Sequence, residues 1–409
     1  MCGIFFYTGK SDKGEEFTYK GLKKLEYRGY DSFGVGGIDG RGKVHLQKFI
    51  GKVSDQKNKE GFADNSCGLA LGHTRWATHG RVSINNAHPH SSHDGRILLV
   101  HNGIFENFQE VKSELLNKKI TFKGETDSEV MVNWIADTLS NQKLDLFEAT
   151  QKCFAQARGS SAFITIDTQA KGWVIYRNGS ALHIGKIGKD EYVAASDVSV
   201  LFEHTQDIYS LKDKEFVTSK NVQNLKFKKI EVAQDVADKG KYKHFTIKEI
   251  FDQTWSVEKA YESATAFSDK ELGLLKKKQI IFTGCGTAFN VGLTAVYLLA
   301  QKGIMARAIP ANEFESFKET LNKNTILFAI SQSGETADTI IACKIVKERG
   351  GKVFAVLNNI YSSMAQMADK VFPIHAGVEI GVVSTKAFSG QIATIMKLFD
   401  FAISKNDFE

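Results

Sequence analysis

The first six residues, Met1-Cys2-Gly3-Ile4-Phe5-Phe6, raise the question that decides the fold. A cysteine directly behind the initiator methionine can be an ordinary small residue that opens a β-strand, because the residues after it favour strands. It can also be a nucleophile. Removal of the methionine would place the Cys2 thiol beside a free α-amine, which titrates at about pH 8 and can serve as its base. Position alone leaves both explanations open.

The bulk properties of the chain predict a globular protein of more than one domain. A length of 409 residues favours two or three domains, since single cores rarely grow that large. No apolar run reaches the length of a membrane span, and charges come too early for a signal peptide, so a cytoplasmic location is expected. The net charge of +6 is spread along the chain, and no nucleic-acid-binding signature accompanies it.

Cysteine and histidine usage argues against disulfides and metals. The five cysteines are widely spaced and include no C-x-x-C pair, so neither a disulfide framework nor a zinc site is expected. Six of the eleven histidines lie between His73 and His101, which makes a metal site the alternative. Without a cysteine partner or an H-E-x-x-H pattern, the prediction is that the chain holds no metal.

The two halves of the chain differ in hydrophobic rhythm. In the first half, short apolar runs alternate with turns, which is typical of antiparallel sheets. Two helices are expected there, one through 105–115 and one that begins with a T-x-x-E capping box at Thr126–Glu129. In the second half, strands and helices alternate, which predicts a doubly wound parallel α/β domain. The predicted domains are residues 1–235, a linker and helix over 236–270, and residues 271–409.

Four buried strands are predicted in the second half. They are QIIFTG at 279–284, NTILFAIS at 324–331, GKVFAVLN at 351–358 and KVFPIHAG at 370–377.

Hydrolysis of a carboxamide by Cys2 would need three further kinds of group. The tetrahedral intermediate needs hydrogen-bond donors, a substrate carboxylate favours arginine, and a substrate ammonium favours a carboxylate. The candidates are Asn102-Gly103, Arg75 and Asp127, which follow strands or begin a helix. Each also has an ordinary explanation as a hairpin turn, a surface ion pair or a helix N-terminal acid.

Taken together, these stretches resemble the class II glutamine amidotransferases, which have the α+β N-terminal nucleophile fold with four αββα layers. The resemblance is carried by CGI at 2–4, LEYRGYDS at 25–32, HTRWATHG at 73–80, NAHPH at 86–90, VHNGIFEN at 100–107 and ETDSE at 125–129. It implies that Cys2 is the nucleophile and that Asn102 and the amide of Gly103 form the oxyanion hole. The implied glutamine-binding residues are Arg28, Arg75, Thr78, His79 and Asp127. Trp76 is either an ammonia gate or an ordinary packing residue.

A phosphate site is predicted in the second half. The stretch GCGT at 284–287 follows a strand, but a full G-x-G-x-x-G fails at Phe289, so a dinucleotide is disfavoured and no cofactor is expected. The stretch SQSGET at 331–336 follows another strand. Free amides at the start of a helix, with the positive end of its dipole, favour phosphate there, and simple capping by serine is the alternative.

Together with GVEIGVVSTKAF at 377–388, these stretches resemble the SIS (sugar isomerase) domain. The pairing of both domains resembles the family of amidotransferases that convert fructose 6-phosphate and glutamine to glucosamine 6-phosphate and glutamate. The implied sugar-phosphate contacts are Cys285, Gly286, Thr287, Ser331, Gln332, Ser333, Thr336, Val382 and Ser384.

Two features depart from that family. Ala288 stands where the family has serine, which is expected to weaken sugar-phosphate binding by about 1 kcal/mol. The family's second SIS domain, which supplies the sugar-side catalytic residues, has no counterpart here. We therefore expect glutaminase activity but not full synthesis from this chain alone, with a homodimer or a separate chain carrying the second SIS domain as partner. The alternatives are a stand-alone glutaminase whose SIS domain senses a sugar phosphate and a non-catalytic sugar-phosphate-binding regulator.

Overall fold

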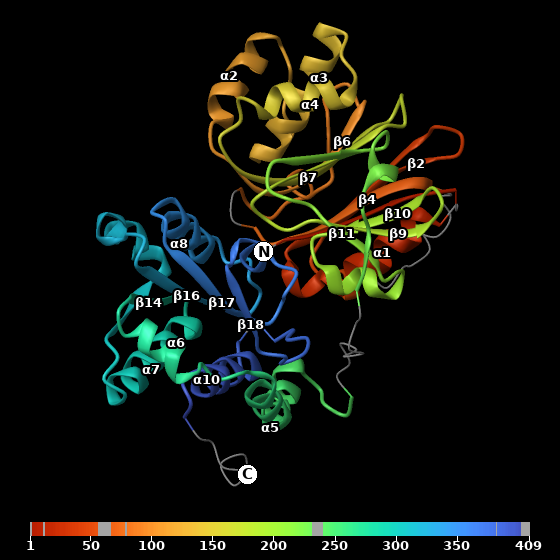
Figure 1. Cartoon of the computed structure of the whole chain (residues 1–409). Helices are drawn as coiled ribbons and strands as arrows, with labels where there is room; N and C mark the ends of the chain where they lie inside the picture. The colour runs from red at the N-terminus through yellow and green to blue at the C-terminus, as the bar shows by residue number, and fades with distance from the viewer. Residues whose placement is uncertain are drawn as a thin grey trace. The chain divides into compact units, whose positions relative to one another are not determined.

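The computed structural model describes residues 2–10, 13–55, 67–77, 80–230, 240–381 and 383–401. Three of the predicted site residues, Thr78, His79 and Val382, lie outside this range. The chain divides into two compact units, Met1–Val232 and Ala233–Glu409, which run from red to green and from green to blue in Figure 1.

The first unit contains two antiparallel sheets. Over the described residues, the first sheet orders eight strands as β13-β11-β9-β10-β1-β4-β2-β3 and the second orders five as β12-β8-β7-β6-β5. The first sheet comprises β1 (Gly3–Thr8), β2 (Ser32–Asp39), β3 (Val44–Ile50), β4 (Cys67–Arg75), β9 (His183–Gly188), β10 (Glu191–Ala195), β11 (Asp207–Ser210) and β13 (Lys228–Lys229). The second comprises β5 (His90–Ser91), β6 (Ile97–Phe105), β7 (Gly159–Asp167), β8 (Trp173–Asn178) and β12 (Glu215–Thr218).

Alternation along β1 explains how the layers stack. Ile4 and Phe6 join a core with Leu98 of the second sheet, so one face of β1 lies between the sheets. Phe5 points the other way, where it meets helix α1 so closely that a Cβ on Gly21 would lie 2.2 Å from its ring. The helices of this unit are α1 (Gly14–Leu25), α2 (Phe108–Asn117), α3 (Asp127–Gln142) and α4 (Leu146–Phe154), with short 3-10 turns at Glu26–Arg28, Val53–Asp55, Val198–Glu203 and Val222–Asn224.

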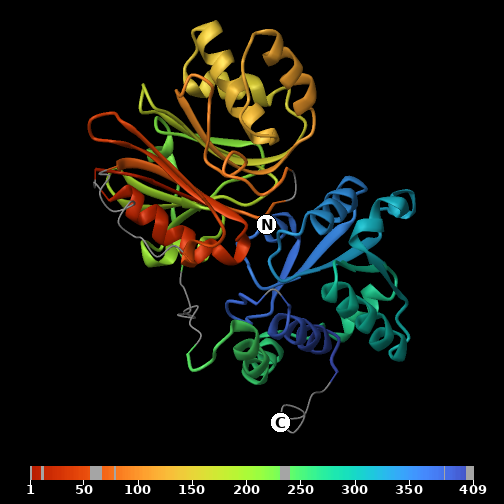
Figure 2. The same ribbon diagram turned by 180° about the vertical axis from the view of Figure 1, so that it is seen from behind.

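Helix α1 covers the outer face of the first sheet, and helices α2 to α4 cover that of the second (Figure 1). The view from behind shows the same order, from the red helix α1 to the yellow and orange helices (Figure 2). The predicted αββα architecture is therefore confirmed. The expectation of only two helices in this half was wrong, because α1 and α4 are also present.

The predicted capping box is only half formed. Thr126 Oγ1 accepts the Glu129 N–H at 3.3 Å, as expected of an N-cap. The Glu129 carboxylate, however, accepts the N–H groups of Lys123 and Gly124 at 2.7 Å each, and so it holds the preceding loop. This arrangement fixes the chain that leads into Asp127.

The second unit is built around one parallel sheet with the order β15-β14-β16-β17-β18. Its strands are β14 (Gln279–Gly284), β15 (Ala306–Pro310), β16 (Thr325–Ser331), β17 (Lys352–Leu357) and β18 (Lys370–Pro373). Its helices are α5 (Phe245–Ser263), α6 (Asp269–Leu275), α7 (Thr287–Gln301), α8 (Ala337–Glu348), α9 (Ser363–Met367) and α10 (Lys386–Leu398), with a 3-10 stretch at Ala311–Thr320. The four predicted strands are present, and the edge strand β15 is additional.

Both faces of this sheet are covered, as the uninterrupted apolar strands predict. Ile280 and Phe282 face a core shared with α7 and α10, whereas Ile281 faces a core shared with α8. Strand β14 has β15 on one side and β16 on the other, so the connections after β14 and β16 leave in opposite directions. Ligands of doubly wound folds bind at the carboxyl ends of strands at such a point. Over the described residues, no helix is long and apolar enough to cross a membrane.

Candidate active site

Cys2 directly precedes the central strand of the first sheet. Strand β1 lies between β4 and β10, and its register with β4 pairs Gly3 with Thr74. This register brings Cys2 to the end of β4, where the Trp76 N–H donates to Cys2 Sγ at 3.3 Å. The predicted nucleophile and the H-T-R-W motif are therefore neighbours, although more than 70 residues separate them.

Burial governs the acidity of this thiol. It raises the pKa of Cys2 above its ordinary value, and the Trp76 N–H and the cationic Arg75 and Arg28 only partly oppose the rise. At neutral pH the sulfur therefore carries its proton. A thiol in this state becomes a nucleophile only when a neighbouring base removes that proton.

Asn102 lies beside Cys2 in the second half of β6. Its side-chain Nδ2 donates to the Cys2 carbonyl at 3.0 Å, and its Oδ1 lies 2.9 Å from His73 Nε2. Burial lowers the pKa of His73 to about 3, so the ring is neutral and carries one N–H. Because Nδ1 has no partner in the described structure, the proton belongs on Nε2, where it fixes the orientation of the Asn102 amide.

His73 is a residue that the sequence analysis did not assign. Its ring stacks on His88 at 4.2 Å between centroids. His101 continues this buried network through Ser128, whose Oγ lies 2.9 Å from Nδ1. Among the described residues, no group of three or more histidine, cysteine, aspartate or glutamate side chains is arranged to hold a metal ion.

Gly103 occupies a position that excludes every other residue. Its φ is +142°, a conformation that L residues rarely adopt. A Cβ at this position would also lie 2.0 Å from the Ser160 carbonyl oxygen on β7. The close pairing of β6 with β7 therefore depends on this glycine.

Arg75, which acts on the Cys2 thiol, and Asp127, which acts on Arg75, carry opposite charges. Arg75 is buried, and its guanidinium donates to the carbonyls of Gly80 at 3.3 Å and Arg81 at 3.4 Å. Burial lowers the pKa of Arg75, while attraction to Cys2 and Asp127 opposes this. Asp127 Oδ2 accepts the Phe105 N–H at 2.8 Å and Oδ1 accepts the Ser128 N–H at 2.8 Å, so the carboxylate is held rigidly.

The structure gives the remaining two candidates specific neighbours. Arg28 forms an ion pair with the carboxylate of Asp197 at 3.0 Å. Burial raises the pKa of Asp197, but the Arg28 guanidinium and the Tyr27 hydroxyl outweigh this effect and hold that pKa well below its usual value. Trp76 is 37% exposed, and its ring packs against Tyr30 at 5.4 Å between centroids.

A cavity of about 180 Å³ lies in the second unit at the carboxyl ends of β14 and β16. Seven of the nine predicted sugar-phosphate residues line it: Cys285, Thr287, Ser331, Gln332, Ser333, Thr336 and Ser384. Gly286 stands at the start of α7 with φ +56°. Ala288 and Gln391 also line the cavity, and Gln391 was not predicted because it comes from the distant helix α10.

Local hydrogen bonds shape the loop after β16. Ser331 Oγ accepts the Gly334 N–H at 3.0 Å, and Ser333 Oγ accepts the Glu335 N–H at 3.1 Å. Gly334 has φ +65°, and a Cβ there would lie 2.0 Å from Ser362 Oγ. The loop therefore holds a fixed shape at the start of α8.

Comparisons with known proteins agree with this architecture. Residues 73–203 match the family model of the glutamine amidotransferase domain, and residues 273–400 match that of the SIS domain. The fold and the site thus define a glutamine amidotransferase of the N-terminal nucleophile type joined to a SIS domain.

The curated relatives narrow this class. The glutamine–fructose-6-phosphate aminotransferase (isomerizing) of Clostridium acetobutylicum is 37% identical over 99% of this chain and 70% of its own length. The enzymes of the same name from Bacteroides thetaiotaomicron and Pyrococcus horikoshii are each 36% identical over 97% of this chain, and the matches cover 68% and 69% of their lengths. The chain belongs to the glutamine–fructose-6-phosphate aminotransferase family.

Proposed function

We propose that Cys2, with Met1 removed, attacks the carboxamide carbon of glutamine. The thiol proton passes to the α-amine of Cys2, which then donates it to the departing nitrogen, so ammonia leaves and a thioester remains. Asn102 Nδ2 and the Gly103 N–H stabilise the oxyanion. Water then cleaves the thioester to glutamate. The place of Cys2 at the start of the chain supports this role for the α-amine, and so does its raised pKa, since a partly buried, protonated thiol requires a base.

Glutamine is recognised at its two charged ends. Arg75 binds the α-carboxylate and Asp127 the α-ammonium, and Arg28, Thr78 and His79 complete the pocket. The rigid hold on Asp127 supports this assignment, because a fixed carboxylate keeps its remaining lone pairs aimed at one place. Trp76 gates the ammonia.

Fructose 6-phosphate binds in the SIS domain, which we propose spans residues 271–409. Its contacts are Cys285, Gly286, Thr287, Ser331, Gln332, Ser333, Thr336, Val382 and Ser384. The observation that carries this proposal is the cavity at the strand ends, which gathers hydroxyl groups and the helix start of α8 as a phosphate requires. The complete reaction forms glucosamine 6-phosphate in the cytoplasm. The chain acts as a homodimer through its SIS domains or with a separate chain that carries the second SIS domain.

The nucleophile is tested by Cys2→Ala. Glutamate release from glutamine should disappear, because no other described group stands where the thiol does. Cys343→Ala, a change of the same type at a buried cysteine of α8, should retain glutaminase activity. An electrophilic glutamine analogue should label Cys2 in a chain that lacks Met1, as read by mass spectrometry. Retained activity in Cys2→Ala, or an adduct on another residue, would refute the assignment.

A further inference from the structure

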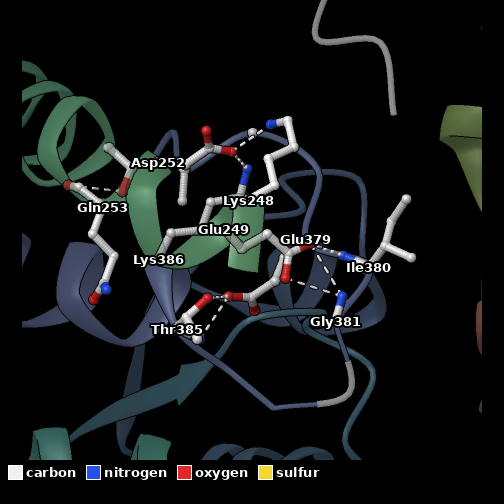
Figure 3. Close-up of polar contacts among 12 residues, drawn as sticks. Lys248, Glu249, Asp252, Gln253, Glu379, Ile380, Gly381, Thr385 and Lys386 are labelled. Atoms are coloured by element: carbon white, nitrogen blue, oxygen red, sulfur yellow. Dashed lines mark hydrogen bonds and ion pairs between the residues drawn. The ribbon is translucent and has the colours of Figure 1, made fainter. Parts of the chain in front are cut away.

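A buried carboxylate of helix α5 holds the backbone just before helix α10 (Figure 3). Glu249 is 1% exposed. Its Oε1 accepts the Ile380 N–H at 2.6 Å and its Oε2 accepts the Gly381 N–H at 3.0 Å. The two main-chain groups therefore compensate a charge that burial would otherwise make costly.

A second carboxylate holds the same segment from its other end. Glu379 Oε1 accepts the N–H groups of Thr385 at 2.9 Å and Ala387 at 3.1 Å, the second of which belongs to the first turn of α10. Its Oε2 accepts the hydroxyl of Ser384 at 3.3 Å. Ser384 lines the cavity, so this carboxylate reaches the wall of the sugar-phosphate site directly.

Neighbouring charges complete the arrangement. Lys386, which is 3% exposed, lies 3.2 Å from the Asp252 carboxylate of α5 and 5.2 Å from the Trp255 ring. Asp252 also pairs with Lys248 at 2.5 Å. Helix α5 is thereby fastened at two adjacent points, by Glu249 to the segment before α10 and by this ion pair to Lys386, the first residue of α10 (Figure 3).

We infer that Glu249 and Glu379 are positioning residues for the sugar-phosphate site: Glu379 sets the chemistry of Ser384, and Glu249 holds the backbone between these two residues. The inference rests on the function proposed for the cavity. Because Ser384 donates its proton to Glu379, its oxygen presents lone pairs to the ligand. It therefore accepts from a hydroxyl of the sugar and does not bind the phosphate, which the loop after β16 receives. Loss of either carboxylate should weaken binding of the sugar part and spare that of the phosphate part.

The test compares Glu249→Gln and Glu379→Gln with Glu258→Gln, the same change at an exposed residue of α5. Isothermal titration of the full chain measures the affinity for fructose 6-phosphate and, separately, for inorganic phosphate. Each of the two buried substitutions should weaken fructose 6-phosphate about tenfold, as expected for one charge-assisted hydrogen bond, and leave inorganic phosphate within about twofold. Glu258→Gln should change neither affinity.

Amide hydrogen exchange provides the structural readout. Exchange should speed up at Ile380 and Gly381 in Glu249→Gln and at Thr385 and Ala387 in Glu379→Gln, while β14 and β16 keep their protection, which also shows that the variants fold. Equal affinities in the variants and the unsubstituted chain would overturn the positioning role, and so would equal weakening of both ligands. If the unsubstituted chain bound no fructose 6-phosphate, the proposed function would fail first and the positioning role with it.

Discussion

The two sites of this chain are assembled in different ways. The thiol site draws on the start of β1, the end of β4, the second half of β6 and the start of α3, and its contacts join residues 74 and 100 positions apart. The phosphate loop bonds within itself, where Ser331 and Ser333 accept amides two or three residues further on, and also to one neighbouring loop, whose amides at 358, 363 and 364 bond to residues 332, 335 and 334. The first site therefore depends on sheet register, whereas the second depends on tight local turns together with the loop that follows the next strand, β17. Matched substitutions in the two sites should expose this difference.

The largest contrast is expected between Gly103→Ala and Gly286→Ala. Both glycines have positive φ, but a Cβ at Gly103 would overlap the Ser160 carbonyl, whereas one at Gly286 would meet open space. Gly103→Ala should lower the free energy of unfolding by more than about 3 kcal/mol and abolish glutaminase activity. Gly286→Ala should cost less, about 1 to 2 kcal/mol, because only its backbone conformation, φ +56° and ψ −128°, is unfavourable to an L residue. Urea unfolding curves measure both, and comparable losses would contradict the contrast.

The second largest effect is expected from removal of His73, which hydrogen-bonds to the proposed oxyanion donor Asn102. His73→Ala leaves the Asn102 amide without the donor that fixes its orientation. The glutaminase kcat should fall about 100-fold, with KM for glutamine changed little, because the lost interaction acts mainly on the transition state. Thr165→Ala, which removes a buried hydrogen bond from β7 to the Leu98 carbonyl of β6, is the control and should change kcat far less. A parallel rise in KM would show that His73 shapes the glutamine pocket instead.

The sequence predicted those parts of both sites whose signal is local. Continuous apolar runs predicted β14 and β16, and glycine and hydroxyl residues at their ends predicted the cavity. Helix α1 was not predicted, because its buried face includes Glu15, Thr18 and Gly21. These small or polar residues let the helix lie against the sheet but hide its apolar periodicity. The role of His73 depends on the pairing of β4 with β1 and on the approach of β6, which no short motif encodes. Gln391 lines the cavity because helix α10 passes beside it, and no nearby motif in the sequence indicates this.

Acid should destabilise the first unit at a higher pH than the second. Burial lowers the pKa of six histidines in the first unit: His73, His88, His90, His101, His183 and His204. For His73 the folded pKa of about 3 lies below the ordinary 6.5, so the unfolded chain binds the proton first and stability falls as the pH drops from 6.5 toward 3. This one residue should cost about 2 kcal/mol at pH 5.

The second unit should lose less stability as the pH falls over the same range. Among its described residues, the pKa of one histidine is lowered, and that residue, His375, is exposed. Hydrogen exchange between pH 7 and pH 4.5 should therefore show β1, β4 and β6 losing protection at a higher pH than β14 and β16. Simultaneous loss, or earlier loss in the second unit, would contradict this account.

The smallest effect is expected where the phosphate site departs from its family. Ala288 lines the cavity beside Thr287, and Ala288→Ser would add one hydroxyl donor without changing the loop after β16. Binding of fructose 6-phosphate should tighten by up to about 1 kcal/mol, or roughly fivefold, because a hydrogen bond exchanged with water yields no more. Inorganic phosphate should tighten equally, since the added donor faces the phosphate part of the ligand. A gain for the sugar phosphate alone would place Ala288 beside the sugar, on the Ser384 side of the cavity.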